Sequence, residues 1–324
     1  MNKVSAPGKN KQTAAKQENP LLSPGWSGAR TPRACILGLG LIGGSWAGAL
    51  TERGWQVSAV EKDPLSLKQA LNCGWIGEGW TEIPSEIDAD LVIAALPLHH
   101  MLEKLDCLME RLKKGGIVTD VGSIKTEISL KASGFRQRGI YFVGGHPMSG
   151  SEKSGFAAAN SQLFKGYPYV LTPEENCPEE VVHKLSELIL SLGAKVILRR
   201  APEHDREVAM ISHIPHMLAV ALTLAAQDVS EKGLSALELA GRSFRELTRI
   251  ADSSPLMWQE ILVSNSSAIL EGLNCWQKRI EELEEFIRNG NREGIIQAFN
   301  QAHSVRETMF SDGAEENLNC CLKA

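Results

Sequence analysis

ACILGLGLIGG, residues 34–44, is the stretch that decides the fold of this chain of 324 residues. It joins a short apolar segment to Gly38, Gly40 and Gly43, at a point where a helix can begin. This spacing is typical of the turn that binds the pyrophosphate of a dinucleotide. Gly38 permits the tight turn, Gly40 lets the backbone approach the phosphates, and Gly43 lets the helix pack against the strand.

A second apolar run, residues 56–60, ends at Glu61. Its distance from the glycines is about the 20 residues expected of the acid that bonds the adenosine ribose. We therefore expect a bound cofactor here rather than a glycine-rich turn without a ligand, with Leu41 and Ile42 beside it in the first helical turn. Because a carboxylate repels a 2′-phosphate, the sequence predicts NAD, although Lys62 leaves NADP open as a second cofactor.

Short apolar strands alternate with amphipathic helices through the first two thirds of the chain. This alternation predicts an α/β fold, an N-terminal Rossmann-type doubly wound parallel sheet. The strands are expected at 34–38, 56–60, 90–96, 116–120, 140–144, 169–171 and 195–198, and the helices at 42–53, 64–73, 99–113, 124–136 and 179–192.

The remainder of the chain is predicted to be helical, over 203–228, 234–250, 255–289 and 292–310. We expect a flexible leader (1–33), an NAD-binding domain (34–200), a helical substrate and dimerisation domain (201–310) and a flexible tail (311–324). The apolar faces of the first and third helical segments exceed what the sheet could cover, which predicts a homodimer.

Composition excludes several classes of protein. A net charge of −5 gives no reason to expect nucleic acid or an anionic membrane as a partner. The leader holds six lysine or arginine residues and one glutamate without a signal-peptide core, and no long uninterrupted apolar run follows it. The seven cysteines include no CxxC pair, so we expect reduced thiols in a cytoplasmic protein and no metal site.

Three loops after predicted strands carry chemistry, because ligands of such a sheet bind at the carboxyl ends of its strands. Leu96 and Pro97 should pass beside the ribose and nicotinamide half of the cofactor. Ser123 and Lys125 follow the next strand, and His146 follows the one after that. A histidine beside a nicotinamide can accept the hydroxyl proton of a substrate that loses a hydride, whereas the plainer alternative is a turn residue bonded to backbone.

Five segments together resemble the prephenate/arogenate dehydrogenase family of tyrosine biosynthesis. They occur in the family's order within about residues 34 to 310. The segments are GLGLIGGS (38–45), DVGSIK (120–125), GGHPMSGSEKSG (144–155), SHIPH (212–216) and LTRIA (247–251).

The resemblance implies oxidative decarboxylation of prephenate by NAD+ to 4-hydroxyphenylpyruvate, carbon dioxide and NADH. Loss of the ring carboxylate makes an aromatic ring, so the enzyme needs mainly positioning and one proton acceptor. By similarity, His146 is that acceptor and Ser123 orients the histidine and the hydroxyl.

Substrate carboxylates require cations in an acidic protein. The resemblance assigns this role to Arg249, whose guanidinium matches a carboxylate fork; an arginine paired with a glutamate on a helix surface is the alternative. It also implies that Glu152 holds Arg249 in a gating ion pair, with Glu246 on a neighbouring helix.

His213 and His216 stand three residues apart across Pro215, on one bent helical face. The sequence has no third metal ligand at a convincing spacing, so a zinc site is not expected. By resemblance, both histidines line the substrate pocket. His204 is placed either near them or on the surface at a helix start, and Trp258 either at the pocket or in the core.

Alternative functions remain open at this stage. Arogenate differs from prephenate only in its side chain, an amino acid in place of a keto acid. A β-hydroxyacid dehydrogenase shares the architecture, and a non-catalytic NAD-binding regulator would lack the chemistry. Tyrosine is expected to inhibit only at the active site, by competing through Arg249 and His146.

Overall fold

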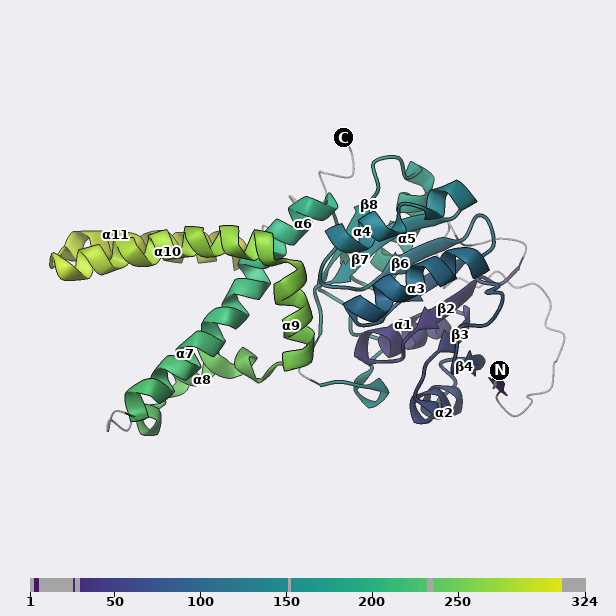
Figure 1. The fold of residues 1–324 in the computed structure, drawn as a ribbon, viewed down its shortest axis with the longest axis horizontal. Helices are drawn as coiled ribbons and strands as arrows, with labels where there is room; N and C mark the ends of the chain where they lie inside the picture. Colours follow the sequence, from purple (N-terminus) through teal and green to yellow (C-terminus); the bar gives the residue numbers. More distant parts are fainter. Residues whose placement is uncertain (1–2, 6–25, 27–29, 151–152, 232–235, 311–324) are drawn as a thin grey trace. The chain divides into compact units, whose positions relative to one another are not determined.

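The computed structural model describes residues 3–5, 26, 30–150, 153–231 and 236–310. The chain forms two compact units, residues 1–266 and 267–324. The first contains the sheet and helices α1 to α9, and the second contains α11 and nearly all of α10 (Figure 1). Most of the predicted leader and all of the predicted tail lie outside the described residues, and the predicted domain division near residue 200 stays a prediction.

A nine-stranded sheet forms the centre of the first unit, in the order β1-β4-β3-β2-β5-β6-β7-β8-β9. All seven predicted strands are present, and the strands from β4 to β7 across the sheet run parallel. Two strand pairs differ from the expectation of a parallel sheet. Strand β8 runs antiparallel to β7, and β1 runs antiparallel to β4. The strands are β1 (Lys3–Ser5), β2 (Arg33–Leu37), β3 (Gln56–Val60), β4 (Glu78–Trp80), β5 (Leu91–Ala94), β6 (Ile117–Asp120), β7 (Tyr141–Pro147), β8 (Pro168–Pro173) and β9 (Lys195–Leu198).

The chain reverses its direction of progress across the sheet at β2. From β2 it moves outward through β3 to β4, and then returns to the other side of β2 for β5, β6 and β7. Ile36 of β2 pairs with Ala59 of β3 on one side and with Ile93 of β5 on the other. The crevice at the carboxyl ends of β2 and β5 is therefore the topological switch point at which such sheets bind ligands.

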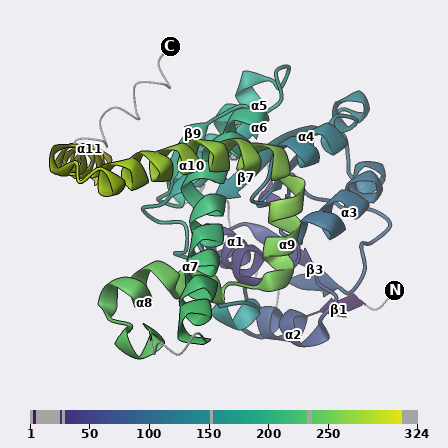
Figure 2. The same ribbon diagram turned by 60° about the vertical axis from the view of Figure 1, so that its left-hand side comes forward.

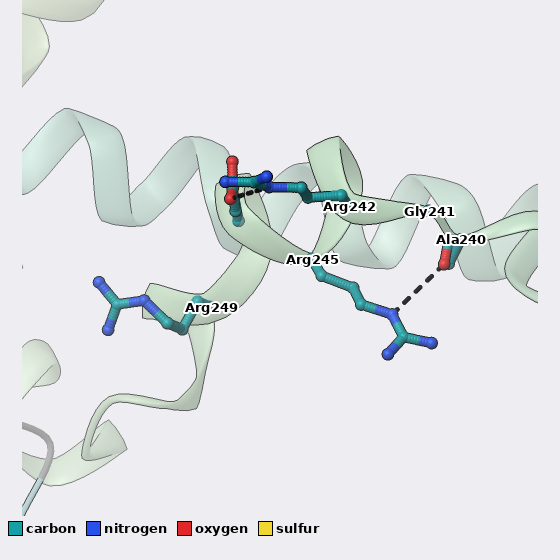
Figure 3. Close-up of a pocket in the computed structure, with 6 residues that line it drawn as sticks. Ala240, Gly241, Arg242, Arg245 and Arg249 are labelled. Atoms are coloured by element: carbon teal, nitrogen blue, oxygen red, sulfur yellow. Dashed lines mark hydrogen bonds and ion pairs between the residues drawn. The ribbon is translucent and has the colours of Figure 1, made fainter.

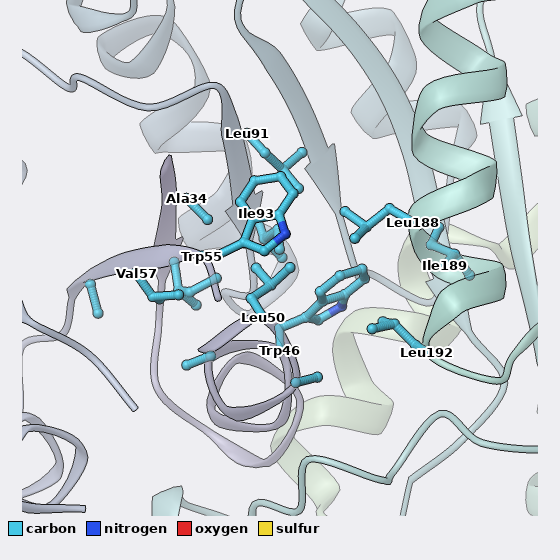
Figure 4. Close-up of a cluster of buried hydrophobic side chains, with 14 of the residues drawn as sticks. Ala34, Trp46, Leu50, Trp55, Val57, Leu91, Ile93, Leu188, Ile189 and Leu192 are labelled. Atoms are coloured by element: carbon cyan, nitrogen blue, oxygen red, sulfur yellow. The ribbon is translucent and has the colours of Figure 1, made fainter. Parts of the chain in front are cut away.

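Helices cover both faces of this sheet. Trp46 and Leu50 of α1 pack with Leu188 and Ile189 of α5 against one face (Figure 4). Met101 and Leu105 of α3 and Ile128 of α4 belong to the cluster on the other face. The helices are α1 (Leu41–Glu52), α2 (Pro64–Asn72), α3 (Leu98–Arg111), α4 (Thr126–Ala132) and α5 (Glu179–Ser191).

The helical part differs from its prediction in where the helices break. The segment predicted as one helix over 203–228 is interrupted by a π-helical turn, Ala209–His213. Pro215 lacks a backbone N–H and its ring crowds the preceding turn, so a wider turn at this point relieves the helix. The helices are α6 (Ala201–Val208), α7 (Ile214–Glu231), α8 (Arg242–Thr248), α9 (Pro255–Ser264), α10 (Ser266–Arg288) and α11 (Arg292–Phe310).

Large apolar side chains remain exposed on these helices. Leu224 of α7 is 54% exposed, Leu256 of α9 is 77% exposed and Phe299 of α11 is 71% exposed. By length and composition, one stretch of helix in the described residues, Ala201–Ser230, could cross a membrane, with a mean hydropathy of 1.7. Its first turns, however, belong to α6, which lies beside the sheet (Figure 2). His204 and Asp205 there are buried, and Asp205 accepts from the backbone N–H of Lys125 at 2.8 Å.

Part of the predicted leader packs on the sheet domain. Trp26 is buried, its ring lies 4.7 Å from that of Trp55, and its indole N–H donates to the carbonyl of Lys184 at 3.1 Å. The Lys184 ammonium lies 4.2 Å from the centre of the Trp26 ring. This tryptophan therefore ties the chain before β2 to the α5 side of the sheet.

Candidate active site

The glycine turn between β2 and α1 is closely packed at two positions and open at the third. Gly38 has a φ of +87°, and a Cβ there would lie 2.4 Å from the carbonyl oxygen of Ala95. A Cβ on Gly43 would lie 1.9 Å from the carbonyl oxygen of Gly38. Gly40, which caps α1, has nothing within 4 Å of the corresponding position. The space above Gly40 and the free N–H groups of α1 therefore fit a pyrophosphate.

Glu61 closes the same turn from the end of β3. Its carboxylate accepts hydrogen bonds from the backbone N–H of Leu39, at 2.7 Å, and of Asp63, at 2.9 Å. These bonds hold the carboxylate beside the glycine turn, where its remaining lone pairs can accept from ribose hydroxyls. Leu96 and Pro97 lie between β5 and α3, on the other side of the crevice.

A fully buried ion pair lies under the next strand ends. Lys125 and Asp120 are 0% exposed and form an ion pair, and the Lys125 ammonium also donates to the carbonyl of Gly145 at 2.7 Å. Asp120 accepts from the backbone N–H of Gly145 at 3.0 Å and of Gly122 at 2.8 Å. Because both charges are satisfied, the pair fixes the ends of β6 and β7 relative to each other.

His146 lies near the carboxyl end of β7, one residue after Gly145, whose backbone bonds to this pair, and is 9% exposed. Burial lowers the pKa of His146 well below its usual value, and positive charge on His204, Lys125 or His213 lowers it further. The imidazole is therefore neutral at physiological pH, which is the state that can accept a proton.

The hydrogen-bond partner of His146 comes from α6. His204 is 1% exposed, and its Nε2 lies 2.8 Å from Nδ1 of His146. The other ring nitrogen of His204, Nδ1, lies 2.8 Å from Oδ1 of Asp205. The sequence allowed His204 either near the site or on the surface at a helix start, and the structure places it beside His146. Asp205 was not singled out from the sequence, because an acidic residue in the first turns of a helix usually faces solvent.

His213 and His216 approach the site from the π turn and from α7, and Trp258 approaches from α9. The Trp258 ring stacks on His216 with centres 3.9 Å apart and meets His213 edge-on at 5.8 Å. Burial lowers the pKa of His213 to about 4, and burial also lowers that of His216. Both rings are therefore neutral at physiological pH. The indole N–H of Trp258 is buried without a hydrogen-bond partner among the described residues.

Arg249 lies at an open pocket of about 510 Å³ that also has Arg242, Arg245 and Glu246 in its wall (Figure 3). Arg242 forms an ion pair with Glu246 at 2.7 Å, and Arg245 donates to the carbonyl of Ala240 at 3.3 Å. Within the described residues the guanidinium of Arg249 has no hydrogen bond or ion pair, and it lies near enough to His216 to lower its pKa. A guanidinium without a protein partner is suited to a carboxylate ligand.

One predicted site residue is not joined to His146 by a hydrogen bond in the described part of the chain, and another lies outside the described residues. Ser123 follows β6 but makes no hydrogen bond to His146 in the described part of the chain, where Nδ1 of that histidine faces His204. Glu152, the predicted partner of Arg249, lies outside the described residues. Among the residues that the structure describes, no three histidine, cysteine or acidic side chains are grouped as metal ligands.

Two family models match successive parts of the chain. The prephenate dehydrogenase nucleotide-binding domain matches residues 46–198, and the prephenate dehydrogenase dimerization domain matches residues 200–301. Prephenate dehydrogenase from Lactococcus lactis is 35% identical over 85% of this chain and 76% of its own length. The Bacillus subtilis enzyme is 32% identical over 84% of this chain and 74% of its own length.

Solved structures resemble the chain over similar lengths. A structure of prephenate dehydrogenase from A. aeolicus in complex with hydroxyphenyl propionate and NAD+ has a TM-score of 0.81 at 27% identity, over 87% of this chain and 100% of that one. Arogenate dehydrogenase from Synechocystis has a TM-score of 0.76 at 30% identity, over 86% of this chain and 99% of that one.

Proposed function

The chain belongs to the prephenate dehydrogenase family, and from that premise we propose that it converts prephenate and NAD+ to 4-hydroxyphenylpyruvate, carbon dioxide and NADH. The observation that carries the proposal beyond family membership is the neutral, buried His146 near the carboxyl end of β7. The family matches do not favour a β-hydroxyacid dehydrogenase, a non-catalytic binding protein or an arogenate dehydrogenase.

The glycine turn and Glu61 would hold NAD. Gly40 leaves room for the pyrophosphate at the start of α1, and the Glu61 carboxylate accepts from the ribose. Leu41, Ile42, Leu96 and Pro97 would complete the walls of this crevice. The cofactor, when bound, supplies the hydride acceptor for the carbinol carbon of the substrate.

His146 would accept the proton of the ring hydroxyl as the carbon–oxygen bond gains double-bond character. When the ring carboxylate leaves as carbon dioxide, its bonding electrons restore the aromatic ring, and His146 can return the proton to the same oxygen as a phenol. No net proton is consumed or released in this sequence. Ser123 would act beside the hydroxyl rather than through a bond to His146.

Arg249 would bind a substrate carboxylate, and His213, His216 and Trp258 would form the wall around the substrate. The guanidinium of Arg249 has no hydrogen bond or ion pair among the residues that the structure describes, and this together with its closeness to His216 supports the assignment. Glu152 would contact Arg249 as a gate. Free tyrosine would compete with prephenate for Arg249 and His146, so its inhibition is expected to be competitive, and noncompetitive inhibition would contradict this.

Direct assay tests the reaction. NADH formation is followed by absorbance with prephenate or arogenate, each combined with NAD+ or NADP+. We expect turnover with prephenate and NAD+ to exceed the other three combinations. Turnover with arogenate but not with prephenate would overturn the proposed substrate, and no turnover with either would overturn the function.

Two further expectations concern the whole protein. The dimerization-domain match and the exposed apolar side chains of α7 and α9 support a homodimer. The similarity to biosynthetic prephenate dehydrogenases supports a protein that acts in the cytoplasm. Its helical domain would begin near residue 200, where the two family models meet. Light scattering at micromolar concentration is expected to give twice the monomer mass, and a monomer would contradict the dimer.

A further inference from the structure

A chain of buried hydrogen bonds leads from His146 through His204 to the carboxylate of Asp205. Nδ1 of His146 faces Nε2 of His204 at 2.8 Å, and Nδ1 of His204 faces Oδ1 of Asp205 at 2.8 Å. Asp205 is held in turn by the backbone N–H groups of Lys125 and Thr126, each at 2.8 Å. The side chains of His146, His204 and Asp205 are all buried.

Asp205 is ionised. Burial raises the pKa of its carboxyl, but the hydrogen bonds from His204, Thr126 and Lys125 outweigh burial and leave the pKa below its usual value. An ionised carboxylate can only accept hydrogen bonds. Nδ1 of His204 therefore carries the proton in its bond to Asp205.

The protonation of His204 determines that of His146. A neutral imidazole carries one N–H, so with its proton on Nδ1 the Nε2 of His204 is an acceptor. Nδ1 of His146 must then donate, which leaves Nε2 of His146 as a bare lone pair. A charged His204 would instead donate through both nitrogens and leave the proton of His146 on Nε2, so an unprotonated Nε2 on His146 requires a neutral His204.

His213 shows the opposite arrangement in the same site. The amide nitrogen of Asn265 lies 2.8 Å from the carbonyl oxygen of Asp205 and 3.2 Å from Nδ1 of His213. Because an amide nitrogen only donates, Nδ1 of His213 accepts and its single proton lies on Nε2. The hydrogen bonds around Asp205 therefore leave His146 with an acceptor at Nε2 and His213 with a donor at Nε2.

We infer that Asp205, acting through His204, is a positioning residue that fixes His146 in the tautomer with an unprotonated Nε2, the nitrogen that takes the substrate's hydroxyl proton. This inference rests on the proposed function for its catalytic meaning, although the tautomer itself exists without substrate. After proton transfer, the imidazolium of His146 donates to His204, whose own N–H donates to the Asp205 carboxylate. Developing positive charge on His146 is thereby stabilised.

The other charged and titratable groups near His146 do not supply this function. Lys125 lies beneath the strand ends, paired with Asp120, and can only donate. His213 has its Nδ1 directed to Asn265. His204 is therefore the group in the described part of the site that can accept from Nδ1 of His146.

Nitrogen-15 NMR of histidine-labelled protein without substrate tests the tautomer directly. The resonances of His146 are identified by their loss in His146→Asn. We expect a protonated Nδ1 and an unprotonated Nε2 in the unsubstituted protein. In His204→Leu, which removes the acceptor, the proton is expected to redistribute toward Nε2. A proton on Nε2 of His146 in the unsubstituted protein would overturn the inference, whether or not the enzyme acts on prephenate.

Kinetics of two variants at residue 204 test the consequence. Removing the acceptor in His204→Leu is expected to lower kcat for prephenate about 100-fold with KM changed less than about twofold. In His204→Gln the amide oxygen can accept from His146 and the amide nitrogen can donate to Asp205, so kcat is expected to fall less than about tenfold. His183→Leu, at an exposed histidine of α5, is the matched control and should leave kcat unchanged.

The two variants separate positioning from folding. Both replace a buried histidine, so a merely structural role would make their losses in kcat similar. Equal losses in the two variants, or an unchanged His146 tautomer in His204→Leu, would overturn the inference. If His204→Leu does not fold, the NMR result for the unsubstituted protein and for His204→Gln still decides the tautomer.

Discussion

The sheet region, residues 33–198, and the helical region from α7 to α9, residues 214–264, place their polar residues in opposite ways. In the sheet region Asp120, Lys125 and His146 are buried and tied to fixed partners, and apolar side chains fill both faces of the sheet. In the helical region Arg249 has no hydrogen bond or ion pair with another residue that the structure describes, and large apolar side chains are exposed. On the proposed function, the difference teaches that the sheet region would supply the fixed groups that the chemistry needs, whereas the helical region would supply the exposed groups that bind a ligand or a second subunit.

His146→Asn tests the sheet side of this comparison and has the largest expected effect. An amide cannot take the hydroxyl proton, so kcat for prephenate should fall about 100-fold or more. The loss is measured by NADH formation at saturating prephenate and NAD+. His183→Asn, at an exposed histidine of α5, should retain kcat. Near-normal turnover of His146→Asn would remove His146 from the chemistry.

Arg249→Ala tests the helical side and should act on binding instead. Loss of a bidentate carboxylate contact is expected to raise KM for prephenate about 30-fold, and Arg249→Lys should recover only part of the loss. Arg279→Ala, at an exposed arginine of α10, is the matched control. If KM for prephenate stays constant and kcat falls in Arg249→Ala, Arg249 acts on the chemical step, and the assignment of chemistry to the sheet region and binding to the helical region fails.

Glu61→Gln sharpens the comparison within the sheet region. The amide oxygen can still accept from Leu39, which keeps the glycine turn in place, but the amide nitrogen cannot accept from the backbone N–H of Asp63. That bond is lost together with the charge that repels a 2′-phosphate. We expect KM for NAD+ to rise about tenfold and KM for NADP+ to fall. Initial rates with each cofactor measure both changes, with Glu103→Gln on the surface of α3 as control. An unchanged ratio of the two KM values would exclude Glu61 as the selecting group.

The smallest expected effect is on stability as a function of pH. In the folded protein His213 has a pKa of about 4, below the 6.5 of a free histidine, so the unfolded chain binds more protons between these values. The contribution of His213 to stability is complete above about pH 6.5 and is lost as the pH falls toward 4. The Tm should fall over that range, and less steeply in His213→Asn. Equal slopes for the two proteins would show that His213 is not buried in its neutral form.

Most of the sheet region was predictable from the sequence, because apolar strands and glycine turns have local signals. The strand at 56–60 and the helix start after Gly40 are examples. The direction of β8 was not predictable, since an apolar run has no mark of its orientation. The three residues of β4 are too few, and contain a glycine, to give a strand pattern.

The site was predictable only where a motif contained the residue. His146 and Arg249 stand in such motifs. The bond from His204 to His146 joins residues 58 positions apart, and nothing in the local pattern distinguishes it from a histidine on a helix surface. The π turn was also missed, because Pro215 indicates a bend but not the width of the turn before it.

The π turn at Ala209–His213 has a consequence for insertions and deletions in this gene. A wide turn accommodates one more residue than a regular α-helical turn would, so removal of one residue from it could be absorbed as ordinary helix without unfolding. Because the wide turn itself holds the extra residue, the helical segments on either side keep nearly the same relative orientation after the deletion, and His204 and His216 stay on their faces. A single-codon deletion here should therefore yield a folded protein in which only the turn that contains His213 is reshaped.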